Sequence, residues 1–368
     1  MDHLSAVAEN AAAASTGPPP PRANPDLIGH GEAEAALLKA YRSGRLAHAW
    51  LLTGPPGIGK ATLAYRFARF VLAGGQGDLL GDAAPTLALD NDDPVFRRVA
   101  AGSHADLLTV ERSLDDRKRL RTVIVVDDVR KAGGFLSLTP AEGGWRVVVV
   151  DCADELNLNA ANALLKMLEE PPDKALLLLI SHAPGRLLPT VRSRCRRLVM
   201  RPLGEGPLGD FLSHHRPQLG DDAAALARLA EGSPGRALAL ADQGGLALYQ
   251  EMVELVAGSP ELDSEALHVL AGRLARADAE PAYRTLMDLL VQWLERLVRG
   301  GATGAAPVEV VPGEGAVMRR LLDRRGLEQW TEVWERIRRL AADADRVNLD
   351  RKQVVIAAFG ALGAATRP

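Results

Sequence analysis

The sequence predicts an α/β fold in which a parallel sheet is flanked by helices, followed by a small helical region and a larger all-helical one. Two continuous apolar runs, residues 145–150 and 176–180, have the composition of strands buried on both faces, and helical patterns separate them. A third run, at 49–53, leads through glycines into another helical pattern. Strand signals stop after Pro202, so we expect the rest of the chain to be helical.

Bulk composition excludes several classes of protein. The chain is 47% hydrophobic, which indicates a globular protein, and its net charge of -3 argues against coating nucleic acid by bulk charge. No apolar stretch approaches the roughly 20 residues of a membrane span. The acidic start, Met1-Asp2-His3, is unlike a signal peptide, so we expect a cytoplasmic protein without a membrane partner. Cys152 and Cys195 are too few for a four-cysteine zinc site, and a structural disulfide is not expected.

Several segments can be assigned from local patterns. Residues 1–24 are rich in Ala and Pro, which is typical of a flexible lead-in. Residues 32–43 predict a helix that Gly44 ends. Residues 74–103 show weak periodicity, which we interpret as a surface excursion. The β-branched run 123–126 predicts a further buried strand that leads into a helix.

Residues 54–62, with the sequence GPPGIGKAT, form a glycine-rich phosphate loop at the start of a helix. Gly54, Gly57 and Gly59 allow a tight turn whose N–H groups face an anion. Lys60 would reach the terminal phosphates of a nucleotide. The alternative is a glycine-rich turn without a ligand, which fits less well with the strand before the loop and the helical spacing after it. We therefore expect ATP or ADP to bind.

The phosphate loop departs from the pattern G-x-x-x-x-G-K-[ST] at its last position. Ala61 stands where a hydroxyl would hold Mg²⁺. Thr62 is a candidate nucleotide contact, but it lies about 100° further around the helix and cannot simply replace that hydroxyl. Binding of Mg²⁺ is therefore expected to be weak or absent, and hydrolysis is a separate question from binding.

Polar residues mark the ends of the predicted strands. In parallel sheets, ligands sit at the carboxyl ends of the strands, where Gly54, Asp151 and Ser181 fall. Asp151 has the position of a carboxylate that holds Mg²⁺ through water; alternatively, it caps the next helix. Cys152 stands where hydrolytic relatives of such loops carry a water-activating glutamate. A thiol with a pKa of roughly 8.5 is a poor base.

A helix and a basic segment complete this part of the chain. Residues 159–168 carry one apolar stripe, and Pro171-Pro172 end the helix. Residues 189–197 are rich in arginine, and one interpretation of this segment is a face that is simply exposed to solvent. Alternatively, an exposed arginine at a helix end beside a nucleotide fold can serve a neighbouring subunit as an arginine finger on its γ-phosphate.

Four segments, residues 54–62, 151–154, 159–172 and 193–195, together resemble AAA+ clamp-loader subunits of bacterial DNA polymerase III. The resemblance runs from about Asn24 to the C-terminus. It implies a P-loop AAA+ domain, a small helical lid and an all-α C-terminal collar domain that joins the subunits. It further implies a hetero-pentamer with motor gamma/tau-like and delta-like subunits. Such a machine uses ATP to open the sliding clamp and place it on primed DNA.

The resemblance also implies roles for single residues. It places this chain nearest to the subunit that acts as a comparatively rigid stator. Arg194 would enter the ATP site of the adjacent motor subunit, Ser181 would be the first sensor and Arg236 the second. Locally, Ser233-Pro234 suit the start of a helix, which puts Arg236 in its first turn. The alternative for Arg236 is an ordinary surface arginine.

This sequence departs from the active motor pattern in three ways. Ala61 removes the Mg²⁺ hydroxyl, Cys152 removes the hydrolytic carboxylate, and no cysteine quartet lies between the phosphate-loop helix and Val123. We therefore expect a component of the polymerase holoenzyme whose own ATPase activity is weak or absent and that binds no zinc. The alternatives are a self-sufficient AAA+ ATPase such as a motor subunit, and a P-loop protein of an unrelated pathway.

Beyond the flexible residues 1–24, we expect the AAA+ domain over 25–202, the lid over 203–249 and the collar over 250–368. Short helices near 207–215, 222–230 and 234–241 would form the lid. His214-His215 has no third ligand in view, so no metal is expected there. In the collar, two long apolar stripes, one through Trp293 and one through Trp330, flank a Gly/Pro-rich loop at 300–315.

Overall fold

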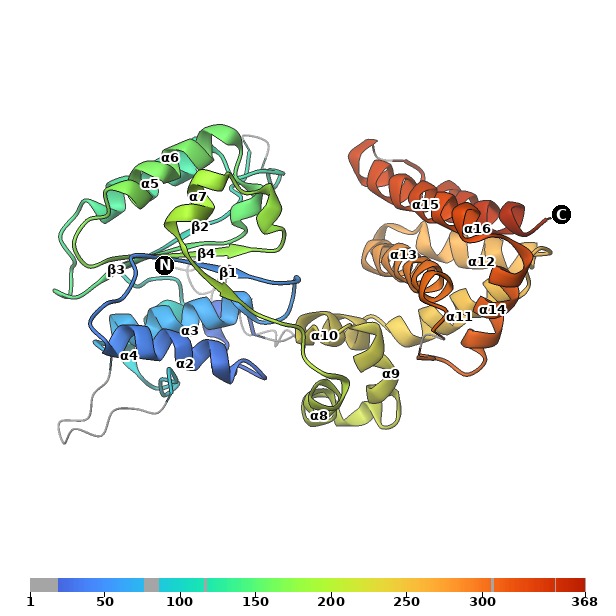
Figure 1. Cartoon of the computed structure of the whole chain (residues 1–368), viewed down its shortest axis with the longest axis horizontal. Helices are drawn as coiled ribbons and strands as arrows, with labels where there is room; N and C mark the ends of the chain where they lie inside the picture. The colour runs from blue at the N-terminus through green and yellow to red at the C-terminus, as the bar shows by residue number, and fades with distance from the viewer. Residues whose placement is uncertain (1–18, 76–85, 116–117, 306–307, 348, 368) are drawn as a thin grey trace, which may run out of the picture. The chain divides into compact units, whose positions relative to one another are not determined.

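The computed structural model describes residues 19–75, 86–115, 118–305, 308–347 and 349–367. These residues divide into two compact units (Figure 1). The first unit comprises the chain up to Gly204 together with Ser233–Gly235, and the second comprises Glu205–Gly232 and Arg236–Pro368. Most of the predicted flexible lead-in, residues 1–18, lies outside the described residues.

A five-stranded parallel sheet forms the centre of the first unit. Its strands lie in the order β2-β3-β4-β1-β5, and every neighbouring pair is parallel, as predicted. The three middle strands are buried along their whole length, which explains their continuous apolar sequences. The strands are β1 (Ala49–Thr53), β2 (Leu107–Val110), β3 (Arg146–Val150), β4 (Ala175–Ser181) and β5 (Arg196–Val199).

Helices cover both faces of this sheet (Figure 1). Because successive strand residues point to opposite faces, Trp50 belongs to one hydrophobic core and Leu51 to the other. The predicted α/β fold with a parallel sheet flanked by helices is therefore confirmed. One face carries α2 (Gly31–Arg42), α3 (Lys60–Leu72) and α4 (Pro94–Ala100), and the other carries α5 (Val126–Leu136), α6 (Leu158–Glu169) and α7 (Pro189–Arg194).

The strand predicted at residues 123–126 is wrong. Ile124 makes only a single parallel bridge, to Leu156, and α5 already begins at Val126. Val123 is 38% exposed, Val125 and Val126 are half-buried, and only Ile124 of this run is fully buried. A short β-branched run can equally well end a loop and begin a helix, and here the tertiary fold selects the helix.

The two edge strands, β2 and β5, were not predicted from the sequence. An edge strand pairs on one side only and is partly covered, so its sequence lacks the long apolar run of a central strand. β5 carries Arg196 and Arg197, and most of its residues are exposed. The basic segment at residues 189–197, for which a solvated face and an arginine finger were the alternatives, therefore spans α7 and the first part of this strand.

Two segments that were predicted to lie outside the core are packed against it where they are described. Phe96 of α4 is buried in the core beneath α3, and Asp93 caps α4 by accepting hydrogen bonds from two of its N–H groups. The surface excursion predicted for residues 74–103 is therefore wrong for this part. Residues 21–23 form a short 3-10 helix, and Arg69 of α3 donates hydrogen bonds to the carbonyl groups of Arg22 and Asn24.

The second unit contains helices and no strand among its described residues. The three short helices and both long apolar stripes occur as predicted, and Trp293 and Trp330 are fully buried. The loop predicted at 300–315 is shorter, because α13 continues to Thr303 and α14 begins at Glu314. The helices are α8 (Glu205–His215), α9 (Asp222–Leu229), α10 (Pro234–Asp242), α11 (Gly245–Ala257), α12 (Ser264–Leu274), α13 (Glu280–Thr303), α14 (Glu314–Arg324), α15 (Leu327–Val347) and α16 (Arg351–Thr366).

The helices predicted for a lid and for a collar group together in this second unit. The boundary between a lid at 203–249 and a collar at 250–368 therefore stays a prediction. Across the described parts of the chain, no helix is both long and apolar enough to cross a membrane.

Candidate nucleotide-binding site

The phosphate loop joins β1 to α3 in the arrangement that the sequence predicts. Gly54, Gly57 and Gly59 all have positive φ angles, of 151°, 73° and 100°. Gly59 is also the N-cap of α3. A Cβ atom at Gly54 would collide with the carbonyl oxygen of Met200, so this position requires glycine for space as well as for conformation. The loop thus presents the start of α3 as an anion site.

Lys60 lies inside the loop and not in solvent. Its Nζ donates to the carbonyl oxygens of Gly54 (2.7 Å) and Pro55 (2.5 Å), and the residue is 3% exposed. Burial lowers the pKa of Lys60 to about 8, although the acidic groups that follow β3 act in the opposite direction. The loop therefore contains a buried ammonium group whose present partners are backbone carbonyls, and an anionic phosphate would be a stronger partner.

A buried histidine supports the phosphate loop from behind. His30 directly precedes α2, is 6% exposed, and its Nε2 lies 2.6 Å from the carbonyl oxygen of Ile58. Because a carbonyl oxygen only accepts, Nε2 must carry the proton of this bond. Burial lowers the pKa of His30, so the ring is neutral at pH 7. The sequence analysis missed His30, because no local pattern connects residue 30 with residue 58.

The acidic side of the site comes directly after β3. Asp151 accepts a hydrogen bond from the amide of Cys152 (3.2 Å), and burial raises the pKa of Asp151. Cys152 has a left-handed backbone conformation with a φ of 59°, which is uncommon for a residue with a side chain. Burial also raises the pKa of the Cys152 thiol to about 12. The thiol therefore stays neutral and offers no base near pH 7.

The end of β4 contributes a buried hydroxyl group. Ser181 pairs with Thr53 in the register of β1 and β4, and its buried hydroxyl group interacts with the carboxylate of Asp154. The next amide, that of His182, donates to Asp154 Oδ1 (2.9 Å). Burial favours a higher pKa for Asp154, but its hydrogen bonds outweigh burial and hold the pKa below its usual value.

The register of neighbouring strands explains why these residues gather. β1, β4 and β3 are adjacent in the sheet, so the segments that follow them meet at one edge. Burial raises the pKa of Asp151, and the positive charge of Lys60 offsets part of this rise, which is consistent with the proximity of the two residues. Thr62 is buried in the first turn of α3. The structure therefore brings together the predicted residues Gly54, Gly57, Gly59, Lys60, Asp151 and Ser181.

Arg194, the predicted finger, is the last residue of α7 and is partly exposed. Its Nη2 forms an ion pair with Oε1 of Glu169 at the end of α6 (2.7 Å), and its Nη1 donates to the carbonyl oxygen of Thr190 (3.0 Å). The side chains of Arg194 and Glu169 are 35% and 48% exposed. Within this chain, the guanidinium group therefore lies against its own domain, with a partner that the sequence analysis did not identify.

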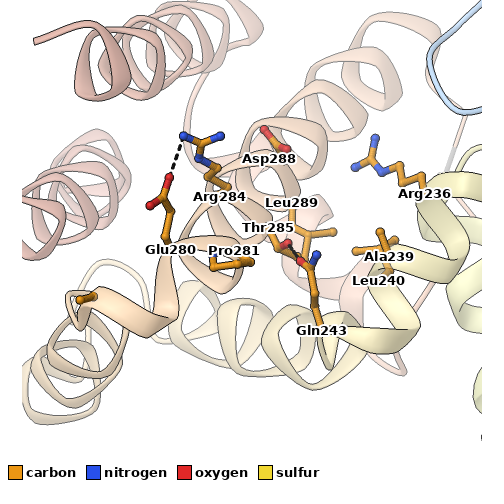
Figure 2. Close-up of a pocket in the computed structure, with 11 residues that line it drawn as sticks. Arg236, Ala239, Leu240, Gln243, Glu280, Pro281, Arg284, Thr285, Asp288 and Leu289 are labelled. Carbon is orange, nitrogen blue, oxygen red and sulfur yellow. Dashed lines mark hydrogen bonds and ion pairs between the residues drawn. The ribbon is translucent and has the colours of Figure 1, made fainter. Parts of the chain in front are cut away.

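Arg236 lies in the first turn of α10, as predicted, and belongs to the second unit. Its Nη2 donates to Oε1 of Gln292 on α13 (2.6 Å). Figure 2 shows Arg236 at the wall of a cavity of about 570 Å³ in this unit. The residues just before it group with the first unit, where the amide of Gly235 donates to the carbonyl oxygen of Gly57 in the phosphate loop (3.0 Å).

Side chains that could hold a metal ion do not cluster anywhere in the described ranges. Cys152 and Cys195 are both free thiols. With Ala61 in the phosphate loop, Asp151 is the remaining predicted protein group for Mg²⁺, so any Mg²⁺ would depend on the phosphates of a nucleotide for its other ligands.

Comparison with known proteins assigns the family. The family described as "DNA polymerase III, delta subunit" matches residues 29–204. The chain is 34% identical to DNA polymerase III subunit delta' of Pseudomonas aeruginosa over 253 residues, which are 69% of this chain and 72% of the relative. It is 32% identical to subunit delta' of Escherichia coli over 278 residues, 75% and 78% of the two chains. Subunit tau of Escherichia coli is 28% identical over 262 residues, 69% of this chain and 36% of tau. The chain therefore belongs to the DNA polymerase III delta' family, one of the clamp-loader families that its sequence resembles.

Proposed function

We propose that this chain is a clamp-loader subunit that holds ATP or ADP without hydrolysing it efficiently and that lends Arg194 to the ATP site of a neighbouring subunit. One observation carries this proposal. The phosphate loop keeps its three glycines and a buried Lys60, but Ala61 and Cys152 occupy the two positions where hydrolytic groups would be expected.

Nucleotide binding is supported by the buried charge that the phosphate loop holds. The ammonium group of Lys60 is buried and donates to two neutral carbonyl groups of the loop. The three glycines of the loop have positive φ angles and turn its backbone toward the start of α3. A phosphate group would pair with this ammonium group and with the N–H groups at the start of α3 at once.

Weak hydrolysis follows from the chemistry of the same site. Attack by water on a γ-phosphate requires a metal ion that neutralises charge and a group that positions the water. Ala61 offers no hydroxyl for Mg²⁺, and the Cys152 thiol, whose burial raises its pKa to about 12, cannot act as the base. Asp151 alone then has to hold Mg²⁺, so we propose weak or absent Mg²⁺ binding and little turnover.

The ion pair of Arg194 with Glu169 does not prevent a role in another subunit. Both side chains are a third to a half exposed, and pairs of this kind contribute only ~0.2–1 kcal/mol. An arginine finger accelerates phosphoryl transfer by roughly 10³–10⁵, equivalent to ~4–7 kcal/mol of transition-state stabilisation. Breaking the ion pair with Glu169 therefore costs less than the finger contributes to the transition state at a neighbouring γ-phosphate.

The partners follow from the family. We propose gamma/tau-like motor subunits and a delta-like subunit, assembled with this chain into a hetero-pentamer that places the sliding clamp on primed DNA. In it, this chain acts as a stator, and Arg236 contacts the nucleotide as the second sensor. The position of Arg236 in the first turn of α10 agrees with this proposed role.

A self-sufficient ATPase is the second candidate function. The similarity to the tau subunit of Escherichia coli, 28% over 262 residues, favours it. This function requires other groups to supply the Mg²⁺ ligand that is missing at Ala61 and the water-activating carboxylate that is missing at Cys152.

Titration of the purified chain with ATP and ADP, with and without Mg²⁺, distinguishes the two candidates. We expect binding that depends little on Mg²⁺ and that Lys60→Ala weakens by about 10- to 100-fold, the effect of losing one or two charge-assisted hydrogen bonds. The matched control is Lys39→Ala, which removes an exposed lysine of α2. No binding by the natural chain would contradict the proposal, and ATP turnover that Lys60→Ala abolishes would favour the second candidate.

A further inference from the structure

We infer that Gln292, a buried amide on α13, is the positioning residue that holds Arg236 in place. Gln292 is 6% exposed. Its Oε1 accepts a hydrogen bond from Nη2 of Arg236 (2.6 Å), and its Nε2 donates to the carbonyl oxygen of Leu229 (3.0 Å). The inference rests on the proposed contact of Arg236 with nucleotide and adds the group that prepares this contact.

The two partners determine how the amide is oriented. The guanidinium group of Arg236 can only donate, and the carbonyl oxygen of Leu229 can only accept. A flipped Gln292 amide would set a donor against a donor and an acceptor against an acceptor. The orientation with Oε1 toward Arg236 is therefore the one that satisfies both partners, in a position where an unsatisfied group costs ~1–3 kcal/mol.

The same amide connects three helices. Leu229 is the last residue of α9, and the last carbonyl groups of a helix have no partner within it. Arg236 lies in the first turn of α10, and Gln292 lies on α13 between fully buried neighbours, among them Leu290 and Trp293. A residue on a well-packed helix thus bonds both to the end of α9 and to the arginine in the first turn of α10.

This arrangement orders Arg236 before a nucleotide arrives. An arginine free to adopt several rotamers loses roughly 0.5–1.5 kcal/mol when a ligand immobilises it, which corresponds to about a 2- to 13-fold difference in affinity. Figure 2 shows Arg236 extending from α10 beside the cavity that α10 and α13 line. Through Gln292, the position of α13 sets the position of Arg236.

The cavity also offers a matched control. Gln243, near the end of α10, bonds through its Oε1 with the hydroxyl group of Thr285 on α13, and both residues line the same cavity (Figure 2). This pair connects the same two helices as Arg236 and Gln292, but it is exposed. Gln243→Ala therefore removes an α10–α13 bond without touching the bond to Arg236.

The first experiment reports on Arg236 without nucleotide. In the full chain, the Nη2–H NMR resonances of Arg236, assigned by their loss in Arg236→Ala, are expected at a position distinct from that of solvated arginines. Gln292→Leu should move the resonance away from this position, and Gln243→Ala should leave it unchanged. Gln292→Glu keeps an acceptor for Arg236 and loses the donor to Leu229, so its resonance should still differ from that in Gln292→Leu. An unchanged resonance in Gln292→Leu overturns the inference.

The second experiment measures the affinity for ADP in the same variants. We expect Gln292→Leu to weaken binding by about 2- to 10-fold, and Gln292→Glu and Gln243→Ala to stay within about twofold of the natural chain. Adding Gln292→Leu to Arg236→Ala should cause no further loss, because the amide acts through the arginine. A further loss as large as in the single variant contradicts the inference. If Arg236→Ala itself leaves affinity unchanged, the proposed role of Arg236 fails, while the NMR result still decides whether Gln292 holds it.

Discussion

Raising the pH should release nucleotide from this chain, because Lys60 loses its proton at a lower pH than an ordinary lysine. Burial lowers the pKa of Lys60 from 10.5 to about 8 in the free protein. Bound phosphates favour the charged form and return the pKa toward its ordinary value or above. Protonated Lys60 binds phosphate and neutral Lys60 does not. The affinity for nucleotide is therefore highest at pH values well below 8 and falls as the pH rises through 8.

The size of the effect follows from the same two pKa values. Above pH 8, each pH unit should reduce the affinity by up to about tenfold, until the pKa of the complex is reached. If that pKa equals 10.5, the whole decrease is 2.5 pH units, or about 300-fold. The terminal phosphate does not contribute, because phosphate monoesters lose their second proton near pH 6, which is roughly the value for phosphorylated side chains.

The assay is a titration with ADP in EDTA at several pH values from about 7 to about 9.5. At the upper limit the affinity should be about 30-fold below its value at pH 7, given a midpoint near pH 8. Lys60→Arg is the control, because a guanidinium group stays protonated over this range and its affinity should not depend on pH. A flat profile in the natural chain between pH 7 and 9.5 would refute the reasoning that a buried Lys60 ammonium holds the phosphates.

Three further substitutions test the site. In Ala61→Ser, ADP should bind about tenfold more tightly with Mg²⁺ than with EDTA, because the serine hydroxyl adds one ligand to the metal ion, and we expect no ATP turnover. Equal affinities with Mg²⁺ and with EDTA would contradict the role assigned to this position. His30→Phe leaves the carbonyl oxygen of Ile58 without its donor, so we expect stability to fall by ~1–3 kcal/mol in thermal unfolding and nucleotide affinity to fall with it, and an unchanged midpoint would speak against support of the loop by His30. Glu169→Gln frees Arg194 from its ion pair, so ATP turnover of the assembled complex should rise by no more than about fivefold, and a decrease would show that the pair assists the finger.

Local sequence patterns were sufficient for the central part of the fold. β1, β3 and β4 are buried on both faces, so their apolar runs identified them, and the residues that follow them identified the site edge. Amphipathic stripes likewise identified the helices of the second unit. The run at 123–126 has the same composition as a strand, but only Ile124 pairs, which composition does not reveal.

The features that sequence reasoning missed all depend on contacts between distant segments. β5 looks like a basic surface because it lies at the edge of the sheet. His30 supports the loop at Ile58, Glu169 pairs with Arg194, and Gln292 holds Arg236, in each case across 25 to 56 residues. Such pairs have no spacing rule, so they become visible only once the fold places the two residues side by side.

The most direct test of the account is the ATP turnover of the reassembled complex in which this chain carries Arg194→Ala. We predict that turnover of the complex falls because hydrolysis at the neighbouring ATP site decreases by at least about 10³, while the isolated variant keeps its fold and its own affinity for ADP. Arg192→Ala, on the same helix, should have no comparable effect. Turnover that stays unchanged in Arg194→Ala would contradict the claim that this chain completes an active site in another subunit.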